Sequence, residues 1–141
     1  MKLVIDNSVV MRWLFKDGSE ADRDYAGKVA SLVETDDVYV PALFVPEAAN
    51  VISRALKAKV ISKINSVACF ELIEDMAAHV VPPEDTSAVM QLTLRAFEDN
   101  LSAYDASYLL LAENLNCPLA TLDQDLRKAA VKRGVFVACW P

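Results

Sequence analysis

The sequence predicts an α/β fold in which a central, mostly parallel sheet of five short strands carries helices on both faces. Three observations support this prediction. Short apolar runs alternate with helical patterns from end to end, no repeat or linker interrupts the alternation, and parallel strands need crossover connections of the length that such helices provide. The chain has 141 residues, the usual size of one domain, so we expect a single α/β/α unit over 1–141.

The first half of the chain predicts two strands and four helices. Apolar runs closed by Asp6 and by Pro41 have the length of buried strands. A later helix has one apolar face that is expected to be buried, formed by Val45, Ala48, Ala49, Ile52, Ala55 and Leu56. The expected elements are a strand at 3–5, helices at 8–15 and around 25–33, a strand at 38–40, a helix from 43 and a helix at 62–77.

The second half continues the alternation and contributes three strands. Pro82 and Pro83 end the first of them, and Gly134 ends the last helix. The first helix of this half is marked by apolar residues at i, i+4 and i+7, namely Met90, Leu94 and Phe97. The expected elements are a strand at 79–81, a helix around 90–97, a helix at 102–115, a strand at 119–121, a helix at 124–133 and a strand at 136–138.

The composition directs attention to carboxylates. His79 is the single histidine and Cys69, Cys117 and Cys139 lack the spacing of a zinc site, so nitrogen–sulfur metal sites and histidine triads are disfavoured. The net charge of −6 argues against a protein that holds nucleic acid by a broad basic surface. That argument weakens if several acids form a metal site, because bound divalent cations offset negative charge.

Neither a signal peptide nor a membrane span is predicted. Asp6 and Asn7 interrupt the apolar start of the chain, and no later run approaches the ~20 apolar residues of a spanning helix. We therefore expect a cytoplasmic protein that does not enter a membrane and whose cysteines are reduced.

Two aspartates follow predicted strands. Asp6 comes after the first strand and Asp123 after the fourth, so both are expected at the sheet edge where parallel α/β folds bind ligands. Each also precedes a helix, and a helix cap, worth about 1 kcal/mol, is an alternative explanation. For either residue taken singly, the cap is favoured.

Two further acids stand at the start of helices. Glu47 lies in a first turn, where an acid complements the helix dipole. Ser102 and Asp105 have the spacing of a capping box. The helix after Asp105 runs ASYLLLA over 106–112, so we expect burial, and a buried carboxylate requires a cation or a hydrogen-bond donor. Capping and an active site remain open for both acids.

Four short segments, in this order and spacing, resemble the PIN domain, and in particular the VapC-type toxins of toxin–antitoxin systems, over nearly the whole chain. The segments are VIDNSVVMRWL at 4–14, PALFVPEAANVI at 41–52, LSAYDASYLLLA at 101–112 and LATLDQDL at 119–126. The resemblance implies a three-layer PIN-like fold whose acids converge at the sheet edge to hold one or two Mg²⁺ or Mn²⁺ ions. By position, those acids are Asp6, Glu47, Asp105 and Asp123.

The resemblance also implies supporting residues. Ser8 and Thr121 match hydroxyl positions that order the acids or a metal-bound water, and Asn50 matches an asparagine often found after the glutamate. Asp125 is an extra acid that either joins the site or complements the dipole of its own helix, and the dipole is favoured. Asn7 departs from the pattern, which usually has a small residue there.

The activity implied by the resemblance is Mg²⁺-dependent hydrolysis of RNA by an endoribonuclease toxin, through metal-activated water. The implied partners are a cognate antitoxin protein and a second copy of the chain. In such toxins the antitoxin tail lies in an apolar groove near the site. Trp13, Phe15 and Phe44 are candidates for this groove, although core packing explains them better.

Two basic groups are candidates for guiding RNA, and a solvated helix face explains each of them equally well. The first group lies in a segment without acids, and the second follows Asp123. The first comprises Arg54, Lys57, Lys59 and Lys63, and the second comprises Arg127, Lys128, Lys132 and Arg133.

Two other functions stay open at this point. A non-catalytic PIN-like domain would only bind RNA or a partner, and it would not require acids at all four positions. A phosphatase or phosphoacceptor domain would use Asp6 as the covalent group. However, Ser8 stands where a haloacid-dehalogenase-like phosphatase has a second aspartate, and Val81 runs into prolines where a receiver-like domain has its phosphoacceptor.

Overall fold

The computed structural model describes residues 1–83 and 85–140, and its elements alternate as predicted. The strands are β1 (Lys2–Ile5), β2 (Asp37–Pro41), β3 (His79–Val81) and β4 (Leu119–Ala120). The helices are α1 (Asn7–Phe15), α2 (Glu20–Val33), α3 (Phe44–Lys57), α4 (Lys63–Asp75), α5 (Ala88–Asp99), α6 (Ala103–Leu115) and α7 (Gln124–Lys132). Within the described ranges, none of these helices is both long and apolar enough to cross a membrane.

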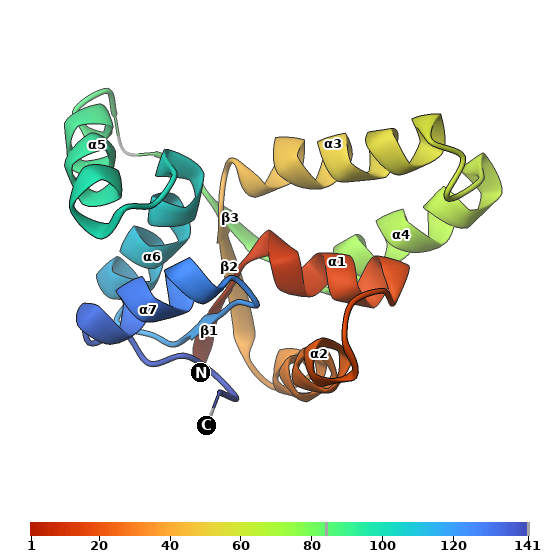
Figure 1. Ribbon diagram of the computed structural model, residues 1–141, viewed down its shortest axis with the longest axis horizontal. Coiled ribbons are helices and arrows are strands. Elements are labelled where there is room, and N and C mark those ends of the chain that lie inside the picture. Colours follow the sequence, from red (N-terminus) through yellow and green to blue (C-terminus); the bar gives the residue numbers. More distant parts are fainter. Residues whose placement is uncertain (84, 141) are drawn as a thin grey trace.

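The strands form one parallel sheet in the order β3-β2-β1-β4. From β1 the chain adds β2 and then β3 on one side, and it reaches the other side of β1 only with β4. The strand order therefore reverses between β1 and β4. Open parallel sheets bind ligands beyond the carboxyl ends of their strands at such a reversal point. In Figure 1, α1 and α3 begin at this end of the sheet, directly after β1 and β2.

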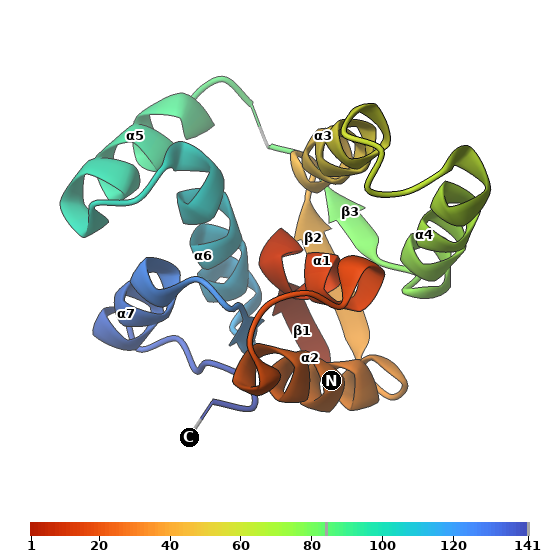
Figure 2. The same ribbon diagram turned by 45° about the vertical axis from the view of Figure 1, so that its right-hand side comes forward.

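Helices cover both faces of the sheet and divide the core in two. Leu3 and Ile5 of β1 pack with α1, α2 and Phe44, whereas Val4 packs with α6 and α7, because successive side chains of a strand point to opposite faces. Figures 1 and 2 show α1 to α4 on one side of the sheet and α5 to α7 on the other. Each fully buried side chain of β1 contributes about 1.5–3 kcal/mol to folding. The predicted three-layer α/β/α fold is confirmed.

The predicted fifth strand at 136–138 is reduced to one isolated parallel bridge, Leu119–Val137, beside a sheet that has four strands in the described part of the chain. Leu119 N donates to Phe136 O and Ala138 N donates to Leu119 O, each at 2.9 Å. The physical reason is the length of β4. It has two residues, and a ladder ends where its partner strand stops offering donors and acceptors.

Two helices expose apolar residues of their periodic patterns, and for α3 the sequence predicted that this face is buried. In α5, Met90, Leu94 and Phe97 are 70%, 50% and 84% exposed, and no described residue of this helix is fully buried. In α3, Val45 and Ala49 are exposed. Periodicity locates the apolar face of a helix, but it does not say whether a neighbouring element covers that face.

Ionic contacts join α5 to the helices beside it. Asp99, whose side chain is 1% exposed, accepts hydrogen bonds from Arg133 at 2.9 Å and from Lys132 at 3.0 Å. These hydrogen bonds, with that from Arg133 contributing most, lower the pKa of Asp99. Arg95 pairs with Glu113 of α6. Charged residues thus face the rest of the molecule, and the apolar stripe of α5 is left in solvent.

Candidate active site

The reversal point between β1 and β4 brings Asp6 next to the residues that follow β4. Asp6 directly follows β1, and its backbone N–H donates to Ala120 O at 2.9 Å, so the two strand ends stay in register. The Asp6 side chain makes no cap hydrogen bond to α1. For this residue the helix-cap explanation is wrong.

Two hydroxyl groups hold one carboxylate oxygen of Asp6. Ser8 Oγ and Thr121 Oγ1 each donate to Asp6 Oδ2 at 2.7 Å. Each hydroxyl also accepts from the backbone, because Leu122 N donates to Ser8 Oγ and Asp123 N donates to Thr121 Oγ1, both at 3.0 Å. A hydroxyl has a single proton, so these N–H groups leave both protons for Asp6. The network holds Asp6 as an acceptor through Oδ2 and leaves Oδ1 for other partners.

Burial and like charges oppose the ionisation of Asp6. The residue is 5% exposed, and desolvation raises its pKa. The hydrogen bonds from Ser8 and Thr121 lower the pKa, while the charges of Glu47 and Asp123 raise it, and the net direction is upward. Among residues 1–83 and 85–140 no basic side chain pairs with Asp6 to offset this rise in its pKa.

Tyr108 contacts Glu47, and the sequence reasoning missed this residue. Glu47, in the first turn of α3, accepts a hydrogen bond from the Tyr108 hydroxyl at 2.7 Å. Desolvation raises the pKa of Glu47, the bond from Tyr108 lowers it and the charge of Asp105 raises it. Burial and the bond to Glu47 raise the pKa of Tyr108, so the phenol keeps its proton. The signal available in the sequence was spacing, because Tyr108 lies three residues after Asp105 on the same face of α6.

Asp105 and Asp123 complete the acidic set. Ser102 caps α6 by accepting from Asp105 N at 3.1 Å, and Asp123 caps α7 by accepting from Leu126 N at 2.8 Å. The Asp105 carboxylate is half-buried, and desolvation, followed by the charges of Asp6 and Asp123, raises its pKa to about 6. Asp123 therefore caps a helix and also adds its charge to the cluster, so the two explanations hold together for this residue.

The four acids form an oxygen-only donor set without a paired cation. Among residues 1–83 and 85–140, none of the four takes part in a salt bridge. No three Asp, Glu, His or Cys side chains in these ranges are placed so as to grip a metal ion directly. Magnesium retains several waters and needs only one or two direct carboxylate ligands. The donor set therefore fits a largely hydrated divalent cation better than one enclosed by protein ligands.

Three residues close in sequence to these acids differ in exposure. Asn50 is exposed one turn after Glu47. Asp125 is exposed in the first turn of α7, and its charge contributes to the raised pKa of Asp105. Asn7 is buried, and its Oδ1 has no hydrogen-bond partner among the described residues.

The structure separates the two basic groups. Every member of the first group is exposed, over the last turns of α3 and the start of α4: Arg54, Lys57, Lys59 and Lys63. In the second group, Arg127 is buried, and Lys132 and Arg133 bind Asp99. A solvated face is therefore a wrong explanation for Arg127, whereas Lys128 and Lys132 are exposed and fit it.

The three aromatic candidates for an apolar groove have different surroundings. Phe44 is 3% exposed and belongs to the core, and Phe15 packs against the same core. Trp13 also packs there but lines a cavity of about 530 Å³ between α1, α2 and α4. Core packing was thus the better explanation for Phe44 and Phe15, while Trp13 packs against the core and also lines a cavity.

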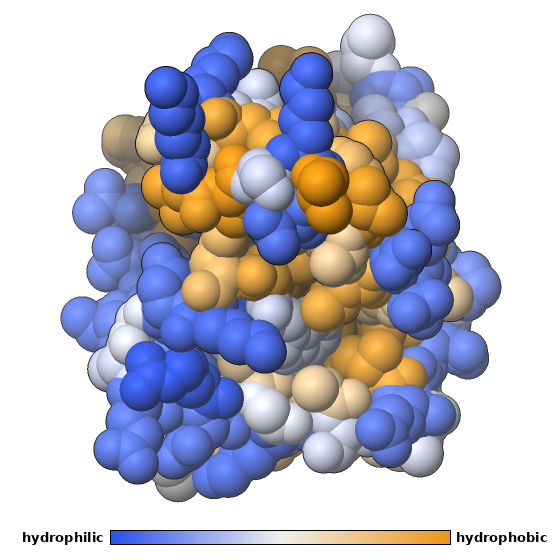
Figure 3. Space-filling view, turned by 90° about the vertical axis from the view of Figure 1, so that its right-hand side faces the viewer, coloured by the Kyte–Doolittle hydropathy of each residue, from blue (hydrophilic) through white to orange (hydrophobic). Residues whose placement is uncertain are grey.

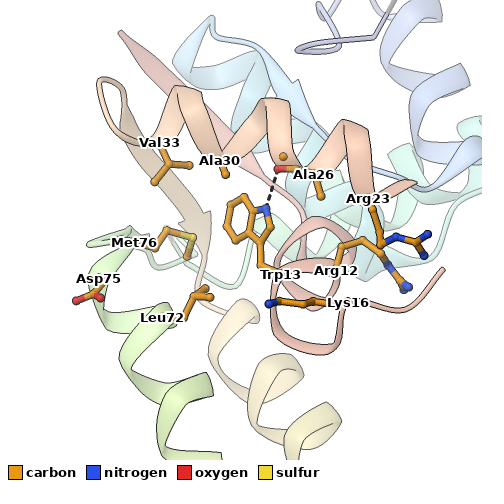
Figure 4. A pocket seen from close by; sticks show the side chains of 11 residues that line it. Arg12, Trp13, Lys16, Arg23, Ala26, Ala30, Val33, Leu72, Asp75 and Met76 are labelled. Atoms are coloured by element: carbon orange, nitrogen blue, oxygen red, sulfur yellow. Dashed lines mark hydrogen bonds between the residues drawn. The ribbon is translucent and has the colours of Figure 1, made fainter. Parts of the chain in front are cut away.

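Figure 4 shows that cavity, with Trp13 at its centre. The indole Nε1 donates to Ala26 O at 2.7 Å, which holds the ring between α2 and α4. Apolar side chains of these two helices form the walls. Arg12, Lys16 and Arg23 also line the cavity, with Arg12 paired to Asp17, and Asp75 lies at its opposite end, so the apolar walls have a mostly basic rim.

Comparisons with known proteins identify the family. The family profile of the PIN domain matches residues 3–132. VapC ribonuclease Mb0985 of Mycobacterium bovis and ribonuclease VapC9 of Mycobacterium tuberculosis are each 30% identical over 123 residues, covering 86% of this chain and 85% of the relative.

Two solved structures share the fold. The crystal structure of PAE2754 from Pyrobaculum aerophilum matches with a TM-score of 0.62 and 22% identity, covering 92% of this chain and 84% of that one. The crystal structure of FitAcB from Neisseria gonorrhoeae matches with a TM-score of 0.55 and 21% identity, covering 96% of this chain and 95% of that one. The profile match, the relatives and the shared fold agree with the four sequence segments: the chain belongs to the PIN domain family.

Proposed function

We propose that this protein is a cytoplasmic, Mg²⁺- or Mn²⁺-dependent endoribonuclease that acts as the toxin of a toxin–antitoxin pair. The observation that carries the proposal is a set of four carboxylates from separate segments around the reversal point of the sheet, near enough for the charge of each to raise the pKa of another. Such mutual repulsion destabilises a fold and is typical of functional sites. Relatives named as ribonucleases support RNA as the substrate.

In this proposal Asp6, Glu47, Asp105 and Asp123 would hold the ion together, largely through the waters that it retains, because no three of them are placed to grip it directly. A bound Mg²⁺ supplies a water of lowered pKa and offsets the charge that develops on the phosphate and the leaving oxygen. Ser8 and Thr121 keep Asp6 oriented through Oδ2, and Tyr108 orients Glu47. The expected products carry a 5′-phosphate and a 3′-hydroxyl.

RNA has to approach a protein whose net charge is −6. The exposed basic group at the α3–α4 end offers positive charge beyond Glu47, with Arg54 and Lys57 on the helix of Glu47 itself. Figure 3 faces this end, where hydrophilic side chains project from an apolar area. Neutralising Lys57 and Lys59 together should weaken RNA binding and flatten its dependence on salt, because fewer counterions are then released. If RNA binding and its dependence on salt are both unchanged, these lysines only form part of the solvated surface.

The antitoxin is proposed to occupy the cavity beside Trp13. Its apolar walls suit apolar side chains, and Lys16 and Arg23 on its rim favour a segment that also carries acidic residues. The second copy of the chain is proposed to cover the exposed apolar stripe of α5, since large exposed apolar patches mark interaction surfaces.

The proposed activity is tested with purified protein and a mixed RNA substrate, with Mg²⁺ and with EDTA. We expect cleavage that requires the metal and that disappears in Asp6→Asn, while Asp24→Asn, which changes an exposed acid of α2, cleaves normally. Calorimetric titration with Mn²⁺ in the absence of RNA measures the site directly. Full activity of a folded and uncontaminated Asp6→Asn protein would refute the assignment of the site.

A non-catalytic PIN domain that binds RNA or a partner is the second candidate. It is favoured by one observation: within the described ranges, no three acids are placed close enough to grip an ion. The same experiment decides between the two. RNA binding without cleavage at any Mg²⁺ or Mn²⁺ concentration, together with no calorimetric signal for Mn²⁺, would establish the non-catalytic function.

A further inference from the structure

Thr121, between β4 and α7, has partners for all of its polar groups. Besides the hydroxyl contacts described above, its backbone N–H donates to Tyr25 Oη at 3.2 Å and its carbonyl accepts from Arg127 Nε at 2.8 Å. Thr121, Tyr25 and Arg127 are 0%, 7% and 6% exposed. Water has little access to replace either backbone contact, so the position of the Thr121 peptide depends on these two side chains.

Arg127 is a buried cation held by aromatic rings rather than by a carboxylate. Its guanidinium lies 4.5 Å from the centre of the Tyr25 ring and 5.2 Å from that of the Trp140 ring. In the described part of the chain it forms no salt bridge, and its guanidinium donates a hydrogen bond to Thr121 O. Burying a charge without a counter-charge is costly. We therefore expect the buried charge of Arg127 to have a specific role, and its hydrogen bond to Thr121 O indicates that this role concerns Thr121.

Tyr25 links the same cluster to the end of the chain. Its hydroxyl donates to Ala138 O at 2.8 Å, and Trp140 lies against Arg127 from the same segment. Helix α2, helix α7 and residues 138–140 therefore meet around the two side chains that hold the Thr121 peptide. On the opposite side of that peptide, the Thr121 hydroxyl donates to Asp6.

We propose that Tyr25 and Arg127 are positioning residues that act through Thr121 to set the orientation of the Asp6 carboxylate. The inference rests on the proposed function, since that orientation matters to an ion only if Asp6 binds one. Holding both the N–H and the C=O of Thr121 fixes its hydroxyl over Asp6 Oδ2. If either contact is lost, the peptide can shift, and Oδ1 is no longer presented in one direction.

The first test measures Mn²⁺ affinity by calorimetry on the full chain without RNA. Tyr25→Phe removes one hydroxyl and keeps the ring beside Arg127, and Arg127→Met removes the donor with a side chain of similar length. We expect each variant to bind Mn²⁺ about tenfold more weakly, the lower end of the loss seen when outer-shell partners are removed. Lys28→Met, which removes a positive charge from an exposed position of α2, should bind like the wild type.

A Thr121→Val background separates positioning from general structural damage. Without the Thr121 hydroxyl, the two residues have nothing through which to act on Asp6. Adding Tyr25→Phe should then weaken Mn²⁺ binding no further, a non-additivity expected of residues that act in series. Equal losses in the two backgrounds, or wild-type affinity in Tyr25→Phe and Arg127→Met, would overturn the inference while leaving the metal site in place.

Amide hydrogen exchange gives a readout that does not depend on the metal. Asp123 N–H donates to the Thr121 hydroxyl, so Arg127→Met should speed its exchange relative to the wild type and to Lys28→Met. If Arg127→Met does not fold, Tyr25→Phe serves for the same measurement. Unchanged exchange at Asp123 would overturn the positioning role. A wild-type protein that binds no Mn²⁺ would instead refute the metal part of the proposed function.

Discussion

Replacing Asp105 by asparagine should stabilise the metal-free protein at neutral pH. Desolvation and the charges of Asp6 and Asp123 raise the pKa of this carboxyl from 3.8 to about 6. Between these two values the folded state holds a proton on Asp105 that the unfolded state has released. Stability therefore falls as pH rises through this window, and the loss is complete above about pH 6. Because asparagine carries no charge at any pH, the variant does not lose this part of the free energy of unfolding.

The size of the effect follows from the shift and from exposure. A shift from 3.8 to about 6 corresponds to about 3 kcal/mol if it is fully expressed. Because Asp105 is only half-buried, solvent screening reduces this to about 1–1.5 kcal/mol. For a chain of this length, such a gain raises Tm by about 3–6 °C.

Thermal unfolding from about pH 4 to pH 8 in EDTA measures the prediction, with Asp24→Asn as a control for removal of an exposed charge. We expect Asp105→Asn to melt above the wild type at pH 7.5 and the two curves to converge near pH 4. Saturating Mg²⁺ should narrow the gap, because a bound cation stabilises the ionised acids of the wild type. A variant no more stable than the wild type at pH 7.5, or a gap that persists at pH 4, would show that the acids are not coupled in this way.

Four other changes have expected outcomes. Asp6→Asn should reduce RNA cleavage by at least about a thousandfold without lowering Tm, because it removes a central ion ligand; cleavage rates and melting curves decide this. Tyr108→Phe should lower kcat about tenfold with little change in KM, by freeing Glu47. Asp99→Asn should lower Tm but not Mn²⁺ affinity, since Asp99 only joins α5 to α7. Phe97→Glu should shift the mass measured by light scattering from dimer to monomer, and a dimer that survives would move the proposed interface elsewhere.

Much of the fold could be predicted from local pattern. The run Leu3–Ile5 is apolar at every position because β1 is buried on both faces, and the helical spacing of apolar residues in α2 matches the buried Tyr25 and Val29. These features depend on periodicity within one segment. The exposure of Met90 and the single bridge at Val137 depend instead on what lies beside each segment, and periodicity carries no information about that.

The candidate site divides in the same way. The types and positions of the four acids can be read from the chain, since each follows a strand or opens a helix. Their hydrogen-bond partners cannot be predicted locally. Thr121 is 115 positions from Asp6, and Tyr108 is 61 positions from Glu47. Only the order of strands in the sheet brings these pairs together.

The sequence by itself therefore determined the succession of strands and helices, the family resemblance and a chemistry restricted to carboxylates. The tertiary structure decided that Asp6 is held by two hydroxyls instead of capping α1, that Tyr108 contacts Glu47, and that Arg127 is buried against aromatic rings. The physical reason is the distance along the chain over which each effect acts. Backbone periodicity acts over a few residues, whereas burial and hydrogen bonding between side chains depend on which elements the parallel sheet places next to one another.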